Sequence, residues 1–324
     1  MPARPALDDY QRRHRWLGLP IAVVYKYIDD QGSYLAALIT YYGFLSLFPL
    51  LLLLTTTLGV VLAGHPDLQQ QVLETAVSQF PVIGEQLGQP QQLSGGTVAV
   101  VVGIAGALYG GLGVGVAVQN AMDTVWAVPK HRRPDPIRGR VRSLALLLVL
   151  GSAAIATTAL AAIGRSAEFL GSLGKAGCVV AAVVINAAIC LIAFRVTTTR
   201  KLTVRQLLPG AAVAAVVWQL LQWFGAAYVT RTVTTASAIN AVFAVVLGLL
   251  AFLFLISVTL VMCAQINVVR VDRLYPRALL TVFTDDVELT PADRRTYARK
   301  ARAEQAKGFE TIRVSYEEDV DEER

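Results

Sequence analysis

Nine polar or charged side chains lie inside or at the ends of long apolar stretches of this sequence, and they are the first candidates for chemistry. They are Gln119, Asn120, Asp123, Asn186, Gln219, Gln222, Asn240, Gln265 and Asn267. Polar groups in an apolar segment are costly to bury, and they often bind a substrate or an ion. For the amides, hydrogen bonding between helices is an equally weighted alternative.

Three charged or polar residues stand near the ends of separate apolar stretches: Asp123, Arg195 and Gln265. A buried carboxylate is costly unless it is paired. We therefore hypothesise a polar cluster in which Asp123 contacts Gln265, Arg195 or both. Asn267 and Gln119 would support this cluster. The alternative is that Asp123 reaches the aqueous edge and pairs with Arg132 or Arg133.

Carboxylates are otherwise scarce in the apolar part of the chain. No Asp or Glu occurs between Phe169 and Val271. A carboxylate relay for proton or sodium coupling would have to use Asp123 or Glu168. This scarcity weighs against a conventional ion-coupled transporter.

Motifs for enzyme chemistry are missing from the sequence. It contains no HExxH, no phosphate-binding GxxxxGK[ST] loop and no GxSxG. The histidines His14, His65 and His131 are scattered, and Cys178, Cys190 and Cys263 follow no CxxC spacing. We expect no enzyme activity, no metal and no cofactor.

Pro49 lies in the middle of the first apolar stretch, within Leu45-Ser46-Leu47-Phe48-Pro49. A proline inside a helix cannot donate to the carbonyl four residues earlier, here that of Leu45, so we expect a kink. The Ser46 hydroxyl is expected to help satisfy the freed backbone. The kink is either a hinge or, with greater weight, a fixed bend for packing.

Glycines crowd the second apolar stretch. Gly106 with Gly110, and Gly111 with Gly115, have the GxxxG spacing that lets helix backbones approach closely. A helix-packing face is favoured over a substrate groove.

The elements that must position these residues are membrane-spanning helices. Only 16% of the 324 residues are charged, and six stretches of 19 or more residues contain no Asp, Glu, Lys or Arg. About 20 apolar residues suffice to cross the hydrocarbon layer. We expect an all-α bundle of six transmembrane helices near Leu35–Leu62, Val98–Val118, Leu144–Ile163, Cys178–Phe194, Leu207–Val229 and Ala238–Ile266.

The basic residues indicate how these helices are oriented. With six spans, 26 of the 29 Lys and Arg residues fall on one side of the membrane. Cytoplasmic loops are enriched in Lys and Arg. The pattern places both termini in the cytoplasm, and it explains the pI near 9.3 by topology rather than by nucleic-acid binding.

Three regions follow from this layout. Residues 1–32 form a cytoplasmic segment with an interfacial helix over Trp16–Ile28, whose apolar face carries Leu17, Ile21, Val24, Tyr25 and Ile28. Residues 33–270 form the transmembrane domain, including an outer loop 64–96 with short amphipathic helices. Residues 271–324 form a cytoplasmic tail, with a helix from Thr290-Pro291 to about Gln305 and an acidic end.

Four sequence blocks resemble the YihY/BrkB family of bacterial inner-membrane proteins over about residues 16–275. The blocks are Leu35-Ala36-Ala37 through Leu45-Ser46-Leu47-Phe48-Pro49, Ala121-Met122-Asp123-Thr124-Val125-Trp126, Leu208-Pro209-Gly210, and Ala264-Gln265-Ile266-Asn267. The family usually has Asn at the position of Asp123 and Glu at that of Gln265. This apparent exchange of one carboxylate is a further reason to place both residues in one cluster.

The resemblance implies an inner-membrane protein that contributes to envelope maintenance. The older ribonuclease label of this family fits none of these residues, and we reject it. The first interpretation is transporter-like handling of a lipid or another amphiphile. The alternative is a non-transporting scaffold for envelope proteins. Membrane lipids and envelope proteins are therefore the expected partners, and nucleic acid is not.

Overall fold

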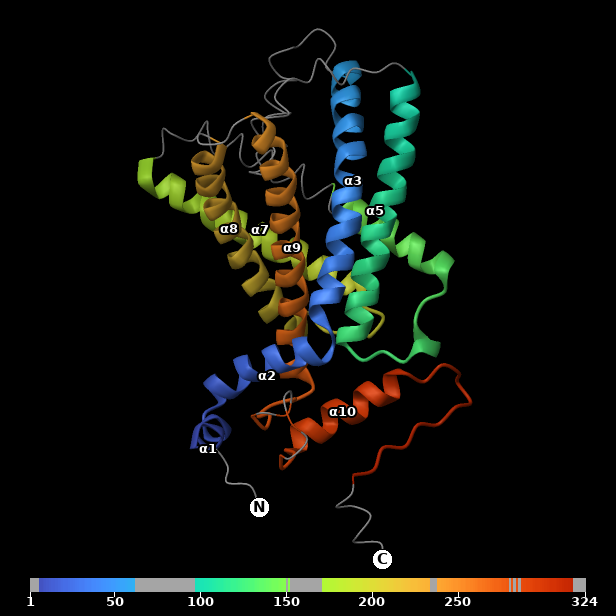
Figure 1. Ribbon diagram of the computed structural model, residues 1–324, viewed down its shortest axis with the longest axis vertical. Helices are drawn as coiled ribbons and strands as arrows, with labels where there is room; N and C mark the ends of the chain where they lie inside the picture. Colours follow the sequence, from blue (N-terminus) through green and yellow to red (C-terminus); the bar gives the residue numbers. More distant parts are fainter. Residues whose placement is uncertain are drawn as a thin grey trace, which may run out of the picture.

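The computed structural model describes residues 6–61, 97–149, 151, 171–233, 238–279, 281, 284 and 287–316. Within these ranges the protein is all-helical and has no strand. Helices α3 (Gly32–Val61) and α5 (Thr97–Val125) form one closely packed pair, and α7 (Gly171–Thr197), α8 (Val204–Val233) and α9 (Ala238–Val271) form a second group (Figure 1). Helix α9 also packs on α3 and joins the two groups.

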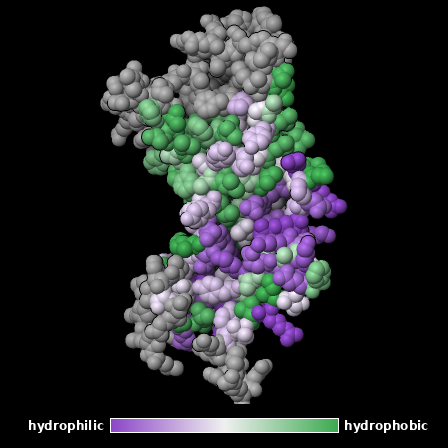
Figure 2. Space-filling view, turned by 45° about the vertical axis from the view of Figure 1, so that its right-hand side comes forward, coloured by the Kyte–Doolittle hydropathy of each residue, from purple (hydrophilic) through white to green (hydrophobic). Residues whose placement is uncertain are grey.

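Four of these helices are long and apolar enough to cross a membrane: Gly103–Val125, Val180–Thr197, Val204–Gln222 and Val246–Val271. Only 17% to 44% of the residues in each of these segments are buried, so many apolar side chains face outward. A band of apolar surface lies above a strongly polar end in Figure 2. A lipid environment accounts for apolar side chains on the outer surface of such helices.

The predicted spans agree with these helices to different extents. Helix α5 continues to Val125, beyond the predicted end at Val118, so its last turns contain Gln119 and Asp123. A helix over 136–149 begins within the predicted basic loop, before the predicted third span. Most of that third span, the loop 64–96 and the acidic end 317–323 lie outside the described residues.

Glycines set the spacing between α3 and α5. A Cβ on Gly106 would lie 2.7 Å from Pro49 Cγ, and one on Gly110 would lie 2.6 Å from Ser46 Cα. Gly111 and Gly115 face a different neighbour, the helix over 136–149. Both GxxxG pairs thus lie at close helix contacts.

Pro49 lies within α3, which is one continuous helix from Gly32 to Val61. The Ser46 hydroxyl donates to the carbonyl of Gly43 at 2.9 Å, so it does not serve the Leu45 carbonyl as expected. A serine in a helix commonly bonds a carbonyl three or four residues earlier, and Ser46 does so with the carbonyl of Gly43. Pro49 contributes to the α3–α5 contact, and a bend at this position stays a prediction.

Two shorter helices lie across one end of the bundle, which we call the polar end (Figure 1). Helix α2 (Arg15–Asp29) packs on α9, and it turns into α3 through Gln31, whose φ is 55°. Gly32 is required at this turn because a Cβ would lie 2.3 Å from the Tyr27 ring. Helix α1 (Ala6–Arg13) precedes α2.

The expected interfacial helix corresponds to α2. Its Val24 and Ile28 are 45% and 47% exposed, whereas Ala22 and Lys26 on the other side are buried. Two residues of the predicted apolar face therefore point away from the bundle, while Leu17, Ile21 and Tyr25 are half-buried. Val23, Leu19 and Tyr27 provide apolar contacts with the core.

The tail contains α10 (Pro291–Ala303), which ends two residues before the predicted end at Gln305. Thr290 caps its first turn by accepting from the Asp293 amide, and the Asp293 side chain bonds back to the Thr290 amide. This capping box with Pro291 is the start predicted from the sequence. The main buried core lies near the polar end, where Met122, Trp126 and Phe194 are among the largest fully buried side chains.

Candidate functional site

Two neighbouring carboxylates, Asp29 and Asp30, lie at the corner between α2 and α3. Asp30 is 7% exposed and its side chain lies within the bundle. The Asp29 side chain is bonded to residues of the tail. The polar end therefore holds two separate buried clusters, one on each side of this corner.

The bundle-side cluster consists of Lys26, Asp30 and Gln265. Asp30 Oδ2 accepts from Lys26 Nζ in a short ion pair and from Gln265 Nε2 at 2.8 Å. Lys26 Nζ also approaches the carbonyl of Val125 at 3.4 Å. The cluster thus connects α2, the end of α5, and α9.

The ion pair between Lys26 and Asp30 is almost completely removed from water. Lys26 is 4% exposed and Gln265 is fully buried. Removal from water lowers the pKa of Lys26 below its ordinary value, and the Asp30 carboxylate opposes this effect. Gln265 Oε1 is buried without a hydrogen-bond partner among the described residues. Buried ion pairs add little net stability, so a functional role for this pair is a reasonable hypothesis.

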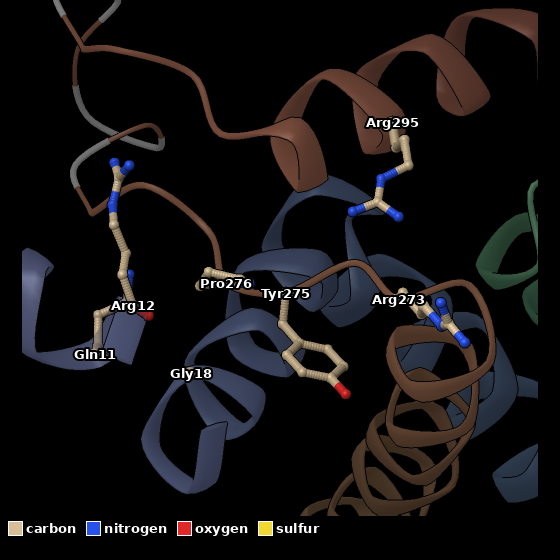
Figure 3. A pocket seen from close by; sticks show the side chains of 7 residues that line it. All are labelled: Gln11, Arg12, Gly18, Arg273, Tyr275, Pro276 and Arg295. Atoms are coloured by element: carbon tan, nitrogen blue, oxygen red, sulfur yellow. The ribbon is translucent and has the colours of Figure 1, made fainter. Parts of the chain in front are cut away.

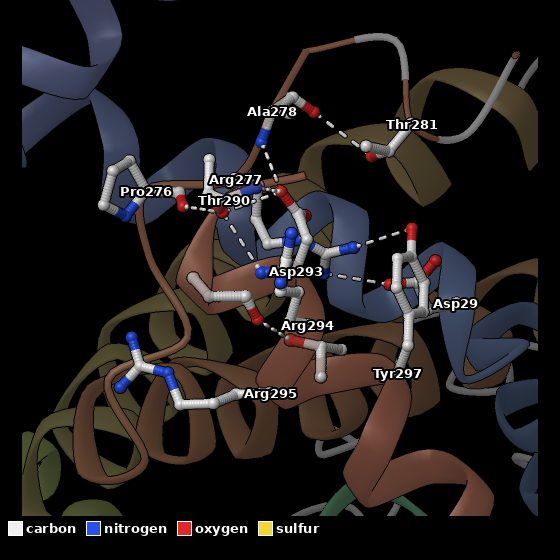
Figure 4. Close-up of polar contacts among 12 residues, drawn as sticks. Asp29, Pro276, Arg277, Ala278, Thr281, Thr290, Asp293, Arg294, Arg295 and Tyr297 are labelled. Atoms are coloured by element: carbon white, nitrogen blue, oxygen red, sulfur yellow. Dashed lines mark hydrogen bonds and ion pairs between the residues drawn. The ribbon is translucent and has the colours of Figure 1, made fainter. Parts of the chain in front are cut away.

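The tail-side cluster consists of Asp29, Arg277, Thr290, Asp293 and Tyr297 (Figure 4). Arg277 is fully buried and bonds Asp29 Oδ2 at 2.9 Å, Asp293 Oδ1, and the Tyr297 hydroxyl at 3.2 Å. Asp293 Oδ2 accepts from the Thr290 amide at 2.9 Å and the Thr290 hydroxyl at 2.7 Å. Burial disfavours the charge on Arg277, yet Asp29 and Asp293 hold its pKa above the ordinary value.

A third contact reinforces the attachment of the tail. Asp272, just after α9, pairs with Arg200 through two bonds of 3.0 Å and with Arg299 of α10. The Arg200 guanidinium also lies 5.2 Å from the centre of the Trp126 ring, and Arg299 donates to the Trp126 carbonyl. Helix α10 is therefore fastened to the loops that close the bundle.

Asp123 does not contact either of its hypothesised partners. It is buried and accepts from the Thr199 amide at 3.2 Å, and Arg142 donates to the Thr199 hydroxyl at 3.3 Å. None of the ion pairs among the described residues joins Asp123 to Arg132 or Arg133, and Arg133 bonds Asn120 and the Val128 carbonyl.

The remaining members of the hypothesised cluster are also separated. Gln119 donates to Ser143 Oγ at 2.9 Å and to the Gly139 carbonyl. Asn267 bonds the Gly210 amide at 2.8 Å and the Leu207 carbonyl at 3.1 Å. Arg195 is exposed. The single shared cluster was wrong, because similar depth along a helix does not fix the direction that a side chain faces.

Sequence reasoning missed Lys26 and Arg277, and it treated Asp30 only as part of a turn. A signal for the first pair was available. Lys26 and Asp30 are four residues apart in an amphipathic helix, a spacing that brings opposite charges together. No comparable local pattern joins Asp29 to Arg277, since their bond spans 248 positions of sequence.

Both clusters consist of charged and polar side chains held by ion pairs and hydrogen bonds. The part of the chain that the structure describes contains no group of three His, Cys, Asp or Glu side chains placed to hold a metal ion. Lys26 and Gln265 both donate to Asp30 Oδ2, so separation of the ion pair would release two donors at once.

Comparison with known proteins gives one match. A family model described as "Virulence factor BrkB" matches residues 23–280. No curated protein and no solved structure matches the chain.

Proposed function

The chain belongs to the BrkB virulence factor family, and we propose that it is a transporter-like protein of the bacterial cytoplasmic membrane that handles a lipid or another amphiphile. The proposal includes six spans, both termini in the cytoplasm, and no catalytic step. Its partners would be membrane lipids, with neither a cofactor nor a nucleic acid involved.

The bundle-side cluster is the observation that carries the proposal. An ion pair buried in a bundle of apolar helices costs several kcal/mol of desolvation for each charge. Such groups commonly lie on substrate or ion pathways. Because Asp30 joins α2 to α9, breaking or neutralising the pair would change how these two elements are held together. We propose that this junction is the moving part.

Asp30 also alters the expectation about coupling. The sequence left only Asp123 and Glu168 as carboxylates for a relay. The chain reversal at Gln31 brings Asp30 against Gln265, so a buried carboxylate is available at α9 after all. Ion coupling at Asp30 and Lys26 is therefore part of the proposal.

The arrangement of the helices supports a lipid or amphiphile as the ligand. Large apolar side chains of α7 and α9 face outward, with Val180 63% and Phe243 70% exposed. These faces are suited to acyl chains, and the basic polar end is suited to anionic headgroups on the cytoplasmic side.

A non-transporting envelope scaffold is the second candidate, and the tail-side cluster favours it. A tail helix held by a buried arginine is a stable platform that could bind another protein. In this alternative the bundle-side cluster would fix the helix arrangement only.

Lipid movement in reconstituted vesicles tests the proposal. The full chain is placed in vesicles that contain a fluorescent phospholipid, and a membrane-impermeant quencher reports exchange between leaflets. We expect exchange with the native chain and its loss in Lys26→Met/Asp30→Leu, which removes both charges together. Exchange no faster than in protein-free vesicles would overturn the proposal and favour the scaffold.

The orientation is tested separately by cysteine labelling in cells. A membrane-impermeant reagent added from outside should label a cysteine placed at Gln89 and should spare one placed at Gly139. The reverse result would contradict the proposed topology.

A further inference from the structure

A cavity of about 370 Å³ lies at the polar end, beside the tail-side cluster. Its lining residues come from four parts of the chain that are distant in sequence: α1, α2, the segment after α9, and α10. They are Gln11, Arg12, Gly18, Arg273, Tyr275, Pro276 and Arg295. In Figure 3, Arg295 reaches from α10 toward Tyr275, while Arg273 and Arg12 lie on opposite sides of the opening.

Three arginines line this cavity, and none of the described lining residues is a carboxylate. Arg12 is held by Asp8 at 2.8 Å, whereas none of the ion pairs in the described part of the chain involves Arg273 or Arg295. Arg295 Nε donates to the Pro291 carbonyl at 2.9 Å, and its terminal nitrogens make no hydrogen bond to the described residues.

Two buried polar atoms of the lining residues lack a hydrogen-bond partner among the described residues: Arg12 Nε and Gln11 Oε1. The Gln11 side chain is fully buried, and its Nε2 is already bonded to Asp8 at 3.0 Å and to the Arg277 carbonyl. Its oxygen therefore needs a donor from elsewhere. Unsatisfied buried atoms are rare in folded proteins and call for an explanation.

We propose that this cavity binds the phosphate group of a glycerophospholipid headgroup that also carries a hydroxyl or ammonium donor. The guanidinium groups of Arg273 and Arg295 hold the phosphate oxygens through charge-assisted bonds. The Gln11 carbonyl oxygen accepts from the headgroup donor. The inference rests on the proposed function for the source of the phosphate, and the same chemistry would also hold a soluble phosphate ester.

The surroundings of the cavity favour a lipid source. Trp16 is 67% exposed and Tyr10 is 48% exposed, and both rings contact His14, at 6.4 Å and 4.2 Å between ring centres. Exposed Trp and Tyr side chains are typical of the membrane–water boundary. Trp16 and the cavity residue Gly18 both belong to the first turn of α2, so the exposed ring and the cavity lie at the same end of this helix.

Binding of defined lipids to the full chain in a non-ionic detergent tests the site. Arg273→Asn/Arg295→Gln removes two cavity charges, and asparagine suits the φ of 52° at position 273. Arg140→Gln/Arg205→Gln removes two charges from exposed positions outside the cavity. All four positions are exposed, so neither double variant should disturb folding.

We expect the Kd for phosphatidylglycerol to rise at least about tenfold in the cavity variant, since each lost charge-assisted bond is worth that much or more. The control variant should change it by less than about threefold. Phosphatidylethanolamine should bind more tightly than phosphatidylcholine, which has no donor for Gln11. Equal affinity for these two lipids would overturn the role of Gln11.

Glycerol phosphate and inorganic phosphate distinguish the sources. If only the lipid shows the loss in the cavity variant, a headgroup is the ligand. If the soluble anions show the same loss, the site holds free phosphate. Unchanged affinity in both arms would overturn the proposal. A chain that binds phosphatidylglycerol in this way but moves no lipid between leaflets would refute the proposed function and leave the site standing.

Discussion

Asp29 and Asp30 follow each other in the chain, yet their surroundings differ in how completely the polar groups are satisfied. Around Asp29, Arg277 uses Nε and both terminal nitrogens, and none of the tail-side side chains has a buried atom without a partner. Around Asp30, one lysine and one amide provide the bonds, and Gln265 Oε1 is unsatisfied.

This difference indicates that the tail-side cluster is a fixed attachment, whereas the bundle-side cluster can rearrange. A fully bonded network has one favourable arrangement, so the tail-side cluster is suited to holding α10 in place. The buried pair of Lys26 and Asp30 has few hydrogen bonds, and the Gln265 amide beside it is unsatisfied. A change of partner in this cluster therefore costs less free energy than one in the tail-side cluster. The bundle-side cluster is therefore the better candidate for a step in function.

The largest expected loss of stability comes from the tail-side cluster. Arg277→Met leaves Asp29 and Asp293 without their cation, and breaking a buried pair in this way costs about 3–5 kcal/mol. We expect a lower thermal midpoint and faster hydrogen exchange of the α10 backbone amides. Arg302→Gln, at an exposed position of the same helix, is the control. If α10 stays equally protected in Arg277→Met, this cluster does not hold the tail.

The bundle-side cluster should show strong coupling between its two charges. Lys26→Met alone leaves a buried carboxylate and should cost about 3 kcal/mol, whereas Lys26→Met/Asp30→Leu should recover most of that loss. Thermal midpoints of the two single variants and the double variant give the coupling energy. Purely additive effects would mean that the two side chains do not depend on each other.

Gly110→Ala tests helix packing without changing any charge, so its loss of stability can be compared with the losses in the two clusters. Gly110→Ala places a Cβ 2.6 Å from Ser46 Cα, and forced repacking of this kind costs about 1–3 kcal/mol. Gly43→Ala in α3 is the matched control, because its Cβ meets nothing within 4 Å. We expect Gly110→Ala to lower the thermal midpoint and Gly43→Ala to leave it unchanged or raise it. Equal midpoints would contradict the close approach of α3 and α5.

The smallest expected change is a pH dependence introduced by Gln265→Glu, which places a second carboxyl group against Asp30. A carboxyl beside Asp30 has a raised pKa, because two carboxylates at this distance disfavour double ionisation. The added stability is present below the unfolded pKa of about 4.3 and is lost as pH rises through the higher folded pKa.

Thermal midpoints between about pH 5 and pH 8 test this shift. Relative to the native chain, Gln265→Glu should lose stability toward pH 8. Gln206→Glu, at the same end of the bundle, controls for one added carboxylate. A flat profile for Gln265→Glu would mean that position 265 does not lie against Asp30.

Much of the fold could be predicted because its causes are local in sequence. Charge-free stretches predicted the long apolar helices, and Thr290, Pro291 and Asp293 predicted the start of α10. The glycine spacing around Gly106 and Gly110 predicted close helix contacts. Each of these patterns acts within one helix or one turn.

The candidate site could not be predicted because its bonds join distant elements. Gln265 bonds Asp30, 235 positions away, and no periodicity in the chain encodes that choice. Asp123 was correctly placed near the end of a helix, but the loop amide of Thr199 is its partner. The depth of a residue along its helix follows from its sequence position. The direction in which its side chain points depends on how that helix is rotated relative to its neighbours.

The most direct test of the account compares the two neighbouring aspartates under the same chemical change. Lipid exchange between vesicle leaflets is measured for Asp29→Asn and Asp30→Asn, and each rate is divided by the amount of folded protein. We predict that Asp29→Asn keeps most of the native rate while Asp30→Asn loses at least about tenfold, the equivalent of 1.4 kcal/mol. Equal rates for the two variants would contradict the division between a fixed tail attachment and a functional bundle-side cluster.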